Sequence, residues 1–459
     1  MRTIDCAVPG SFRDPSGHVF VHDQVLYRAV NLVYRDEYDL LNQSGLYDAL
    51  VKDGLLIPHE EVSSTVDSSP NIYKILKPEA VPFISYPYEW CFSQLQHAAL
   101  LTLEIQRRAL RYGMMLKDAS AYNIQFHQGT PVFIDSLSFE RYTEGQPWVA
   151  YRQFCQHFLA PLALMSAVDI RLNQLSRVHI DGIPLDLTSA LLPWSSRLRF
   201  GVLSHIHLHA KSQRQFAAER LSDRSRPVSK NALFGLIESL QSTTERLSCP
   251  QPESCWSSYY EDNSYTEDDM AEKIVLVGRI LDELAPRTMW DLGANTGRFS
   301  QLAGEKGINV IAFEGDPGSS EQHYRTCVKR QDAQVLPLVL DLANPSSAIG
   351  WAHEERQSLI DRGPTDVVVA LALIHHLAIA NNIPFEKIAK FLSDIGHHLI
   401  IEFVPKHDSQ VQRLLASRID IFSDYTQEHF EQTFGSCFAI ERSVKIGDSG
   451  RVLYVMKRR

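Results

Sequence analysis

Short apolar runs alternate with longer amphipathic segments along the C-terminal half of the chain. Runs of this length, bounded by turn residues, predict buried strands. They predict strands at 288–292, 309–313, 334–340, 365–371 and 398–403. A last pair of runs, 437–444 and 451–457, is separated by Gly447-Asp-Ser-Gly450, which is typical of a hairpin. Alternating strands and helices with a closing hairpin predict a doubly wound α/β sheet with an antiparallel edge.

The N-terminal half has a less regular pattern, which predicts a mixed α+β region. It predicts strands at 17–22, 73–77 and 81–86, a strand or a helix start at 24–30, and helices within 40–56 and over 89–112. The turn-rich stretch 247–255 marks a boundary. The pattern therefore predicts two domains, at 1–245 and 246–459.

Composition narrows the class of protein. At 459 residues the chain is too long for one ordinary domain, and its net charge of −10 argues against a surface built to bind nucleic acid. Seven cysteines without a CxxC pair are typical of reduced thiols. No apolar run is long enough for a signal peptide or a membrane span. We expect a soluble, cytoplasmic protein without nucleic-acid or membrane partners, and its oligomeric state stays open.

The strand expected at 288–292 runs into a glycine-rich turn, Asp291-Leu-Gly293-Ala-Asn295-Thr-Gly297. Glycine lets the backbone turn tightly and approach a ligand closely. The next strand ends in Glu314, whose carboxylate can accept hydrogen bonds from both hydroxyls of a ribose. A dinucleotide fingerprint needs Gly-x-Gly-x-x-Gly, but Asn295 takes its middle position and Arg298 its third. The turn therefore disfavours NAD.

Four stretches in order resemble the motifs of class I S-adenosylmethionine-dependent methyltransferases. They are the turn just described, Ala312-Phe-Glu314-Gly-Asp316-Pro, Leu340-Asp341-Leu342 and Ala370-Leu-Ala-Leu-Ile-His375-His376-Leu. The resemblance implies a Rossmann-like, seven-stranded domain whose cofactor is S-adenosylmethionine.

The same resemblance implies roles for individual residues. Asp291 would contact the methionine amino group, and Gly293 and Gly297 would pass under the cofactor with Asn295 between them. The acid at the end of the second strand, Glu314, would hold the ribose. The residues that end the third and fourth strands and would meet the adenine or line the site are Asp341, Leu342 and Leu371.

Candidate catalytic residues follow the fourth and fifth strands. Methyl transfer to a hydroxyl needs a base, and His375 or His376 lies where substrate and methyl group should meet. The alternative is that one histidine packs and the other bonds the backbone. Glu402 is a second candidate base. We expect a small molecule, a glycan or a peptide as the acceptor, with O-methylation the first hypothesis.

Residues 113–138 resemble the catalytic and metal-binding loops of protein kinases and small-molecule phosphotransferases. The pattern is Asp118-x-x-x-x-Asn123, then a strand, then a strand followed by Asp135. The resemblance implies that Asp118 orients or deprotonates the attacking hydroxyl. It also implies that Asn123 and Asp135 bind magnesium. No glycine-rich phosphate loop precedes them, and Ser136 replaces the Phe of Asp-Phe-Gly. This predicts a kinase-like region that does not transfer phosphate.

Two other functions stay open: a bifunctional kinase–methyltransferase and a non-catalytic protein that senses the cofactor. The whole chain resembles bacterial methyltransferases with a long N-terminal extension, some of them labelled nodulation proteins.

Three further stretches each allow two interpretations. His205, His207 and His209 would share a face of a strand and bind zinc, or form a partly buried polar element, which is favoured. The basic stretch 211–230 is a solvated linker or a site for an acidic group. The aromatic stretch 256–265 covers the cofactor or packs on the sheet.

Overall fold

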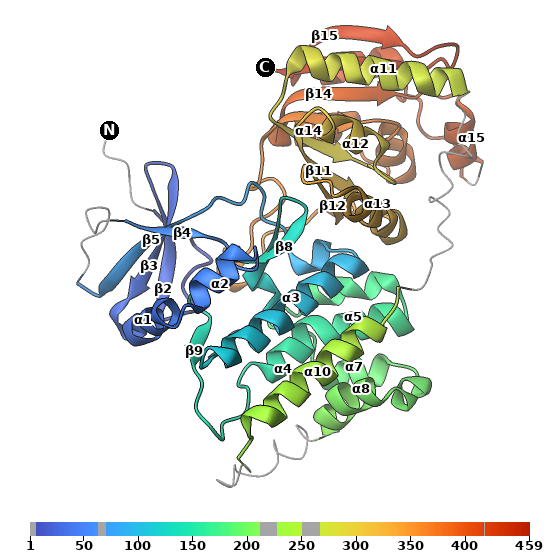
Figure 1. Cartoon of the computed structure of the whole chain (residues 1–459). Helices are drawn as coiled ribbons and strands as arrows, with labels where there is room; N and C mark the ends of the chain where they lie inside the picture. Colours follow the sequence, from blue (N-terminus) through green and yellow to red (C-terminus); the bar gives the residue numbers. More distant parts are fainter. Residues whose placement is uncertain (1–5, 63–69, 212–226, 250–266, 417) are drawn as a thin grey trace. The chain divides into compact units, whose positions relative to one another are not determined.

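The computed structural model describes residues 6–62, 70–211, 227–249, 267–416 and 418–459 (Figure 1). The chain forms two compact units. Unit 1 comprises Met1–Pro250 together with Gly350–Arg356, and unit 2 comprises Gln251–Ile349 and Gln357–Arg459. A short piece of the C-terminal half therefore belongs to unit 1.

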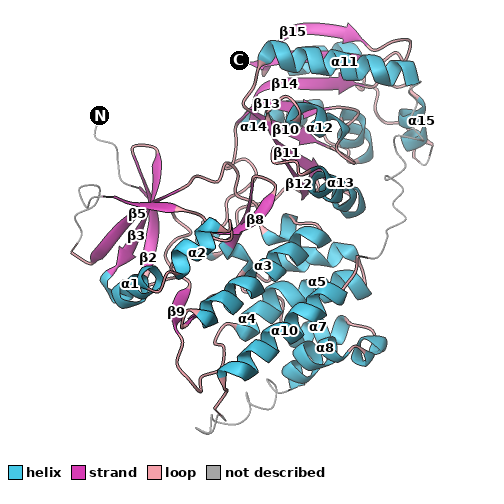
Figure 2. Ribbon diagram, viewed as in Figure 1, coloured by secondary structure: helices cyan, strands magenta, loops and turns pink. Residues whose placement is uncertain are grey.

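Unit 2 is built on a seven-stranded sheet (Figure 2). Its order is β12-β11-β10-β13-β14-β16-β15. In chain order the strands are β10 (Thr288–Leu292), β11 (Asn309–Glu314), β12 (Val335–Val339), β13 (Thr365–Ala370), β14 (Gly396–Phe403), β15 (Phe438–Lys445) and β16 (Val452–Arg458). The first five are parallel, whereas β16 is antiparallel to both of its neighbours. The predicted strands and the antiparallel edge are confirmed.

The helical elements after residue 266 precede or connect the strands of unit 2, although one of them, η8, belongs to unit 1. They are α11 (Glu267–Leu284), α12 (Arg298–Gly304), α13 (Pro317–Arg330), α14 (Phe385–Ile395), α15 (Ser409–Leu415), α16 (Gln427–Phe434) and the short turns η8 (Trp351–His353, in unit 1) and η9 (His376–Ala380). On α11, Val277 and Leu281 are buried in one core with Val310 and Val367 of the sheet. Phe385 of α14 contacts Phe430 of α16 in a second, aromatic layer. The buried side chains of both layers explain why the parallel strands are almost continuously apolar.

Unit 1 begins with a five-stranded antiparallel sheet of order β1-β2-β3-β5-β4. The strands and the helices between them are β1 (Cys6–Ala7), β2 (Gly17–His22), β3 (Val25–Asn31), η1 (Leu32–Tyr34), α1 (Arg35–Gln43), α2 (Leu46–Lys52), β4 (His59–Val62) and β5 (Ile72–Pro78). The stretch 24–30 is thus a strand.

The strand predicted at 81–86 is wrong. Residues 81–86 lie outside the strands, and the 3₁₀ turn η2 (Pro87–Glu89) follows them. Two prolines, Pro82 and Pro87, remove ladder donors from this stretch. The amide of Ser85 donates instead to Oε1 of Gln125 at 2.9 Å, so the backbone is satisfied by a side chain.

The rest of unit 1 is mainly helical. Its elements are α3 (Phe92–Arg111), β6 (Met114–Leu116), η3 (Ala121–Asn123), β7 (Ile124–His127), β8 (Thr130–Phe133), β9 (Phe139–Arg141), α4 (Tyr151–Phe154), η4 (Cys155–Leu159), α5 (Ala160–Ala167), η5 (Ile170–Gln174), α6 (Leu175–Val178), α7 (Leu185–Leu191), η6 (Trp194–Leu198), α8 (Phe200–Val202), η7 (Leu203–Leu208) and α10 (Lys230–Arg246). The helix predicted over 89–112 is confirmed as α3.

Two sets of contacts explain the division of the chain. Gln96 of α3 donates through Nε2 to the carbonyls of Thr244 and Leu247, which keeps the end of α10 in unit 1 beyond residue 245. Arg13 donates from Nε and Nη2 to the two carboxylate oxygens of Glu355, at 2.8 and 2.6 Å. The guanidinium of Arg356 lies 3.9 Å from the ring centroid of Tyr122. These contacts hold Gly350–Arg356 within unit 1.

Candidate active site

The glycine-rich turn of unit 2 is fixed against the end of the neighbouring strand. The amides of Gly293 and Ala294 donate to the carbonyl of Phe313 in β11, at 2.8 and 3.0 Å. Strand β10 lies between β11 and β13, where the order of the parallel strands reverses. Ligands of open α/β sheets bind at such a switch point, beyond the carboxyl ends of the strands.

Three residues of this turn have left-handed backbone conformations. The φ angles are 74° at Gly293, 51° at Asn295 and 86° at Gly297. Asparagine tolerates this region better than most side chains do. A Cβ atom on Gly297 would lie 1.9 Å from Nε2 of the buried His323, so both sterics and φ require glycine there.

Glu314 braces the same turn. Its Oε2 accepts from the amide of Asn295 and its Oε1 from the amide of Asp316, both at 2.8 Å. Burial raises the pKa of Glu314. Its own carbonyl accepts from the amide of Leu340 at 2.8 Å, which brings the start of the loop after β12 beside it.

The other residues predicted to meet the adenine end the adjacent strands. Asp341 is exposed, and its Oδ1 accepts from the amide of Ala343 at 2.8 Å. Leu342 is half-buried, and Leu371, directly after β13, is buried. They stand at the same edge of the sheet as the glycine-rich turn.

Asp291 is a buried carboxyl at the end of β10. Its Oδ2 accepts from the hydroxyl of Ser300 in α12 at 2.5 Å. Burial raises the pKa of Asp291 to about 6, and the Ser300 hydrogen bond and the Lys273 charge oppose this rise. The carboxyl is therefore easier to protonate than an exposed aspartate.

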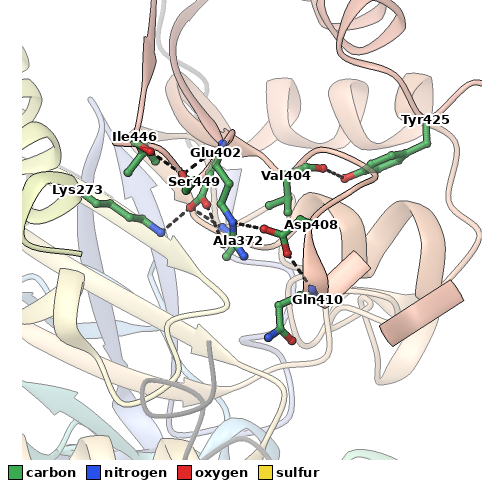
Figure 3. Close-up of polar contacts among 10 residues, drawn as sticks. Lys273, Ala372, Glu402, Val404, Asp408, Gln410, Tyr425, Ile446 and Ser449 are labelled. Atoms are coloured by element: carbon green, nitrogen blue, oxygen red, sulfur yellow. Dashed lines mark hydrogen bonds and ion pairs between the residues drawn. The ribbon is translucent and has the colours of Figure 1, made fainter. Parts of the chain in front are cut away.

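A network of four buried charges lies at the carboxyl end of β14 (Figure 3). Nζ of Lys273, from α11, is 2.5 Å from Oε2 of Glu402. Arg451, which precedes β16, contacts Oε1 of Glu402 at 3.0 Å through Nη1 and Oδ2 of Asp408 at 2.8 Å through Nε. Two cations and two anions balance, so the charges are compensated inside the protein.

The network continues into the turn after β13. Oε2 of Glu402 also accepts from the amide of Ala372 at 3.1 Å, and Ala372 has a left-handed φ of 51°. A non-glycine residue in this region stores strain, which the surrounding contacts must hold. Glu402 is thus part of a structural ion pair, and its action as a base stays a prediction.

The two candidate histidines follow that turn. Their ring centroids are 4.2 Å apart. His375 is fully buried, and neither of its ring nitrogens has a hydrogen-bond partner in the part of the chain that the structure describes. Burial lowers the pKa of both groups, that of His376 to about 4. Both imidazoles are therefore neutral at neutral pH, and burial disfavours their protonated forms.

Sequence reasoning missed the cations of the network. Lys273 and Arg451 are almost fully buried, at 2% and 0% exposure. One signal was present: Lys273 lies on the apolar face of α11, three residues after the buried Met270 and four before the buried Val277. A lysine at such a position needs a buried counter-charge.

The predicted kinase-like residues come together in unit 1. Asp118 accepts from the amide of Ser120 at 2.9 Å, and Asn123 donates to the hydroxyl of Ser138 at 3.1 Å. Burial raises the pKa of Asp118, and the charge of Asp135 adds to this rise. Asp135 pairs with Arg28 of β3 at 2.6 Å. Across the described ranges, no three acidic, histidine or cysteine side chains are grouped as metal ligands.

Hydroxyl groups satisfy two of the three clustered histidines. The ring nitrogens of His205 lie 2.8 Å from the Tyr151 hydroxyl and 2.9 Å from that of Ser239. His207 lies between the hydroxyls of Ser189 and Ser196 in the same way. The partly buried polar element is therefore supported over a zinc site. The aromatic stretch 256–265 and the basic residues 212–226 lie outside the described residues.

Unit 2 is an α/β domain built on a doubly wound sheet, and the candidate site lies at the carboxyl edge of that sheet. The whole chain is 36% identical over 459 residues to nodulation protein NoeA of Rhizobium meliloti (strain 1021), and the match covers 98% of this chain and 96% of that protein. The chain belongs to the NoeA family of nodulation proteins. No protein-family model matches the sequence.

Solved structures resemble the chain only in part. WbdD, a bifunctional kinase-methyltransferase, is 14% identical with a TM-score of 0.28, and the match covers 42% of this chain and 40% of that longer one. The N-methyltransferase NodS of Bradyrhizobium japonicum WM9 is 12% identical with a TM-score of 0.31, covering 42% of this chain and 97% of NodS. Among the helices that the structure describes, none has the length and apolar content to span a membrane.

The buried network gives a stability prediction. Arg451→Met leaves Glu402 and Asp408 without their shared cation, and we expect the free energy of unfolding to fall by about 3–5 kcal/mol. Urea denaturation followed by circular dichroism measures this loss. The control is Arg442→Met, which breaks an exposed pair with Glu283 and should leave the free energy of unfolding almost unchanged. Equal losses in the two variants would contradict a special role for the buried charges.

Proposed function

We propose that the protein is an S-adenosylmethionine-dependent methyltransferase whose cofactor site lies in unit 2. One observation carries the proposal: the buried Asp291 and the bracing Glu314 end two adjacent parallel strands, on either side of a turn that is left-handed at three residues. The glycine-rich turn lets the backbone come close to a ligand, with one acidic side chain on each side of it. One carboxylate can pair with an ammonium group, and the other can accept hydrogen bonds from ribose hydroxyls. The motifs that resemble class I methyltransferases fall on these same residues.

The donor groups fit this cofactor. Asp291 would hold the ammonium group, Glu314 the ribose hydroxyls and Asp341 the adenine amino group. The orphaned nitrogens of His375 also favour a ligand or water at this edge, because an unsatisfied buried polar group costs about 1–3 kcal/mol. Bound S-adenosylmethionine supplies a methyl group activated by its sulfonium.

The chain's own residues would prepare the acceptor. His376 is the candidate base for an acceptor hydroxyl, with His375 as the alternative: both imidazoles are neutral at physiological pH, and their lowered pKa makes each a weaker base than an exposed histidine. The Glu402 hydrogen bond to Ala372 would orient the turn that carries both histidines. We therefore favour O-methylation of a small molecule, a glycan or a peptide in the cytoplasm. The name of the relative from Rhizobium meliloti suggests that the product serves nodulation.

Calorimetric titration with S-adenosylmethionine tests the cofactor site. Gly293→Arg should abolish binding, because the side chain would project from the turn at the switch point. Gly307→Arg is the matched control: it also has a positive φ, 78°, but nothing lies within 4 Å of its Cβ position. Binding retained in Gly293→Arg would overturn the proposal. Cofactor binding by the unmodified protein without transfer of labelled methyl groups to any component of cell extract would favour a cofactor sensor.

The pKa of Asp291 gives a pH prediction. The cofactor's ammonium group pairs with the ionised carboxylate, which predominates above about pH 6 and takes up a proton below it. We expect affinity for S-adenosylmethionine to fall below that pH, approaching about tenfold per pH unit. Asp291→Asn should bind weakly throughout and lose this dependence. Calorimetry between pH 7 and pH 5 measures both proteins, and a flat profile for the unmodified protein would contradict the assignment.

We further propose that unit 1 does not transfer phosphate. The observation in favour is the ion pair between Arg28 and Asp135, which gives the predicted metal ligand an internal cation as its partner. We expect no binding heat when magnesium and ATP are titrated into the protein. Binding that Asp135→Ala abolishes and Asp14→Ala leaves intact would contradict this proposal and favour the bifunctional alternative.

A further inference from the structure

One short segment of unit 1 exposes an unusual number of large apolar side chains. It runs from the end of α7 through η6 and α8 to η7, and α7 and α8 both contact η7. Figure 1 labels α7 and α8. The exposed fractions are 70% for Trp194, 73% for Leu198 and 78% for Phe200. Leu191 and Leu208 are also exposed. We call these five residues the apolar face.

The segment is fixed from its inner side. Ser196 is buried between Trp194 and Leu198, and its hydroxyl lies 2.8 Å from Nε2 of His207. A Cβ atom on Gly201 would lie 1.9 Å from the Thr243 hydroxyl of α10, so the backbone of α8 lies directly on that helix. These anchors hold the backbone in place while the apolar side chains project outward.

The charge of this segment differs from that of the whole chain. Residues 187–211 contain Arg197, Arg199 and Lys211 and no Asp or Glu, although the net charge of the protein is −10. Arg197 and Arg199 are exposed, and neither has an ion-pair partner among residues that the structure describes. Among its described residues, the segment that carries the apolar face is therefore positively charged.

Exposed tryptophan, phenylalanine and leucine beside arginine suit the boundary between lipid headgroups and acyl chains, where aromatic rings insert and cations meet anionic lipid. We propose that the apolar face binds the surface of an anionic lipid bilayer. A second copy of the chain fits less well, because a two-fold interface would bring the same arginines of both copies together. The inference does not depend on the proposed activity, and it differs from the expectation, made from the sequence, that the protein has no membrane partner.

Co-sedimentation of the full chain with extruded vesicles tests this proposal. We expect binding to vesicles of phosphatidylcholine with phosphatidylglycerol, little binding to phosphatidylcholine alone, and release at high salt. Trp194→Ser combined with Leu198→Ser and Phe200→Ser should reduce binding at least about tenfold. Arg197→Gln combined with Arg199→Gln should reduce it by about tenfold and weaken the salt dependence.

The matched control carries Leu32→Ser and Val33→Ser, which change apolar residues of η1 that are also exposed in unit 1. It should bind as the unmodified protein does, and circular dichroism melts should be the same for all variants that are compared. Absence of binding to anionic vesicles would overturn the proposal, as would equal losses in the control. A concentration-dependent dimer that the triple variant abolishes, without lipid binding, would assign the apolar face to a second copy.

Discussion

The carboxylate of Glu402 is the centre on which the functional edge of unit 2 depends. It is fully buried, so its charge must be balanced within the protein. Lys273 and Arg451 supply that balance, and each comes from an element distant in sequence. The fifth parallel strand is thereby tied to the first helix of the unit and to the closing hairpin. A buried ion pair of this kind adds little net stability but strongly disfavours arrangements that separate its members.

The same carboxylate connects this frame to the residues of the proposed chemistry. Through its bond to the Ala372 amide it holds a left-handed residue two positions after β13, and the two histidines follow within four residues. The charge of Lys273 also reaches Asp291 at the end of β10. The network therefore links Asp291, a proposed cofactor residue, with the turn that carries the two candidate histidines. Neutral histidines beside a balanced network are the expected result of burial.

Local patterns in the sequence were enough to predict the strands of unit 2, because buried parallel strands such as β13 are short, continuous apolar runs. They also placed Asp291 and Glu314 at strand ends, since the first polar residue after such a run marks the edge of the sheet. Partners distant in sequence could not be found in this way. Lys273 and Glu402 are 129 residues apart, and only the folded sheet brings them together. The strand prediction for 81–86 is wrong for a related reason. The side chain of Gln125, forty residues after Ser85, accepts the hydrogen bond from the Ser85 amide that a neighbouring strand would have accepted.

The assignment of Gly350–Arg356 to unit 1 has a consequence for how the protein forms. The chain leaves unit 1 after Pro250 and returns to it for these few residues before completing unit 2. A ribosome that has released only the first 250 residues has therefore not yet made Glu355, the partner of Arg13. Unit 1 acquires its last contacts only after three strands of unit 2 have been synthesised. Unit 1 is therefore completed only after synthesis of unit 2 has begun. A fragment that ends at Pro250 lacks part of unit 1.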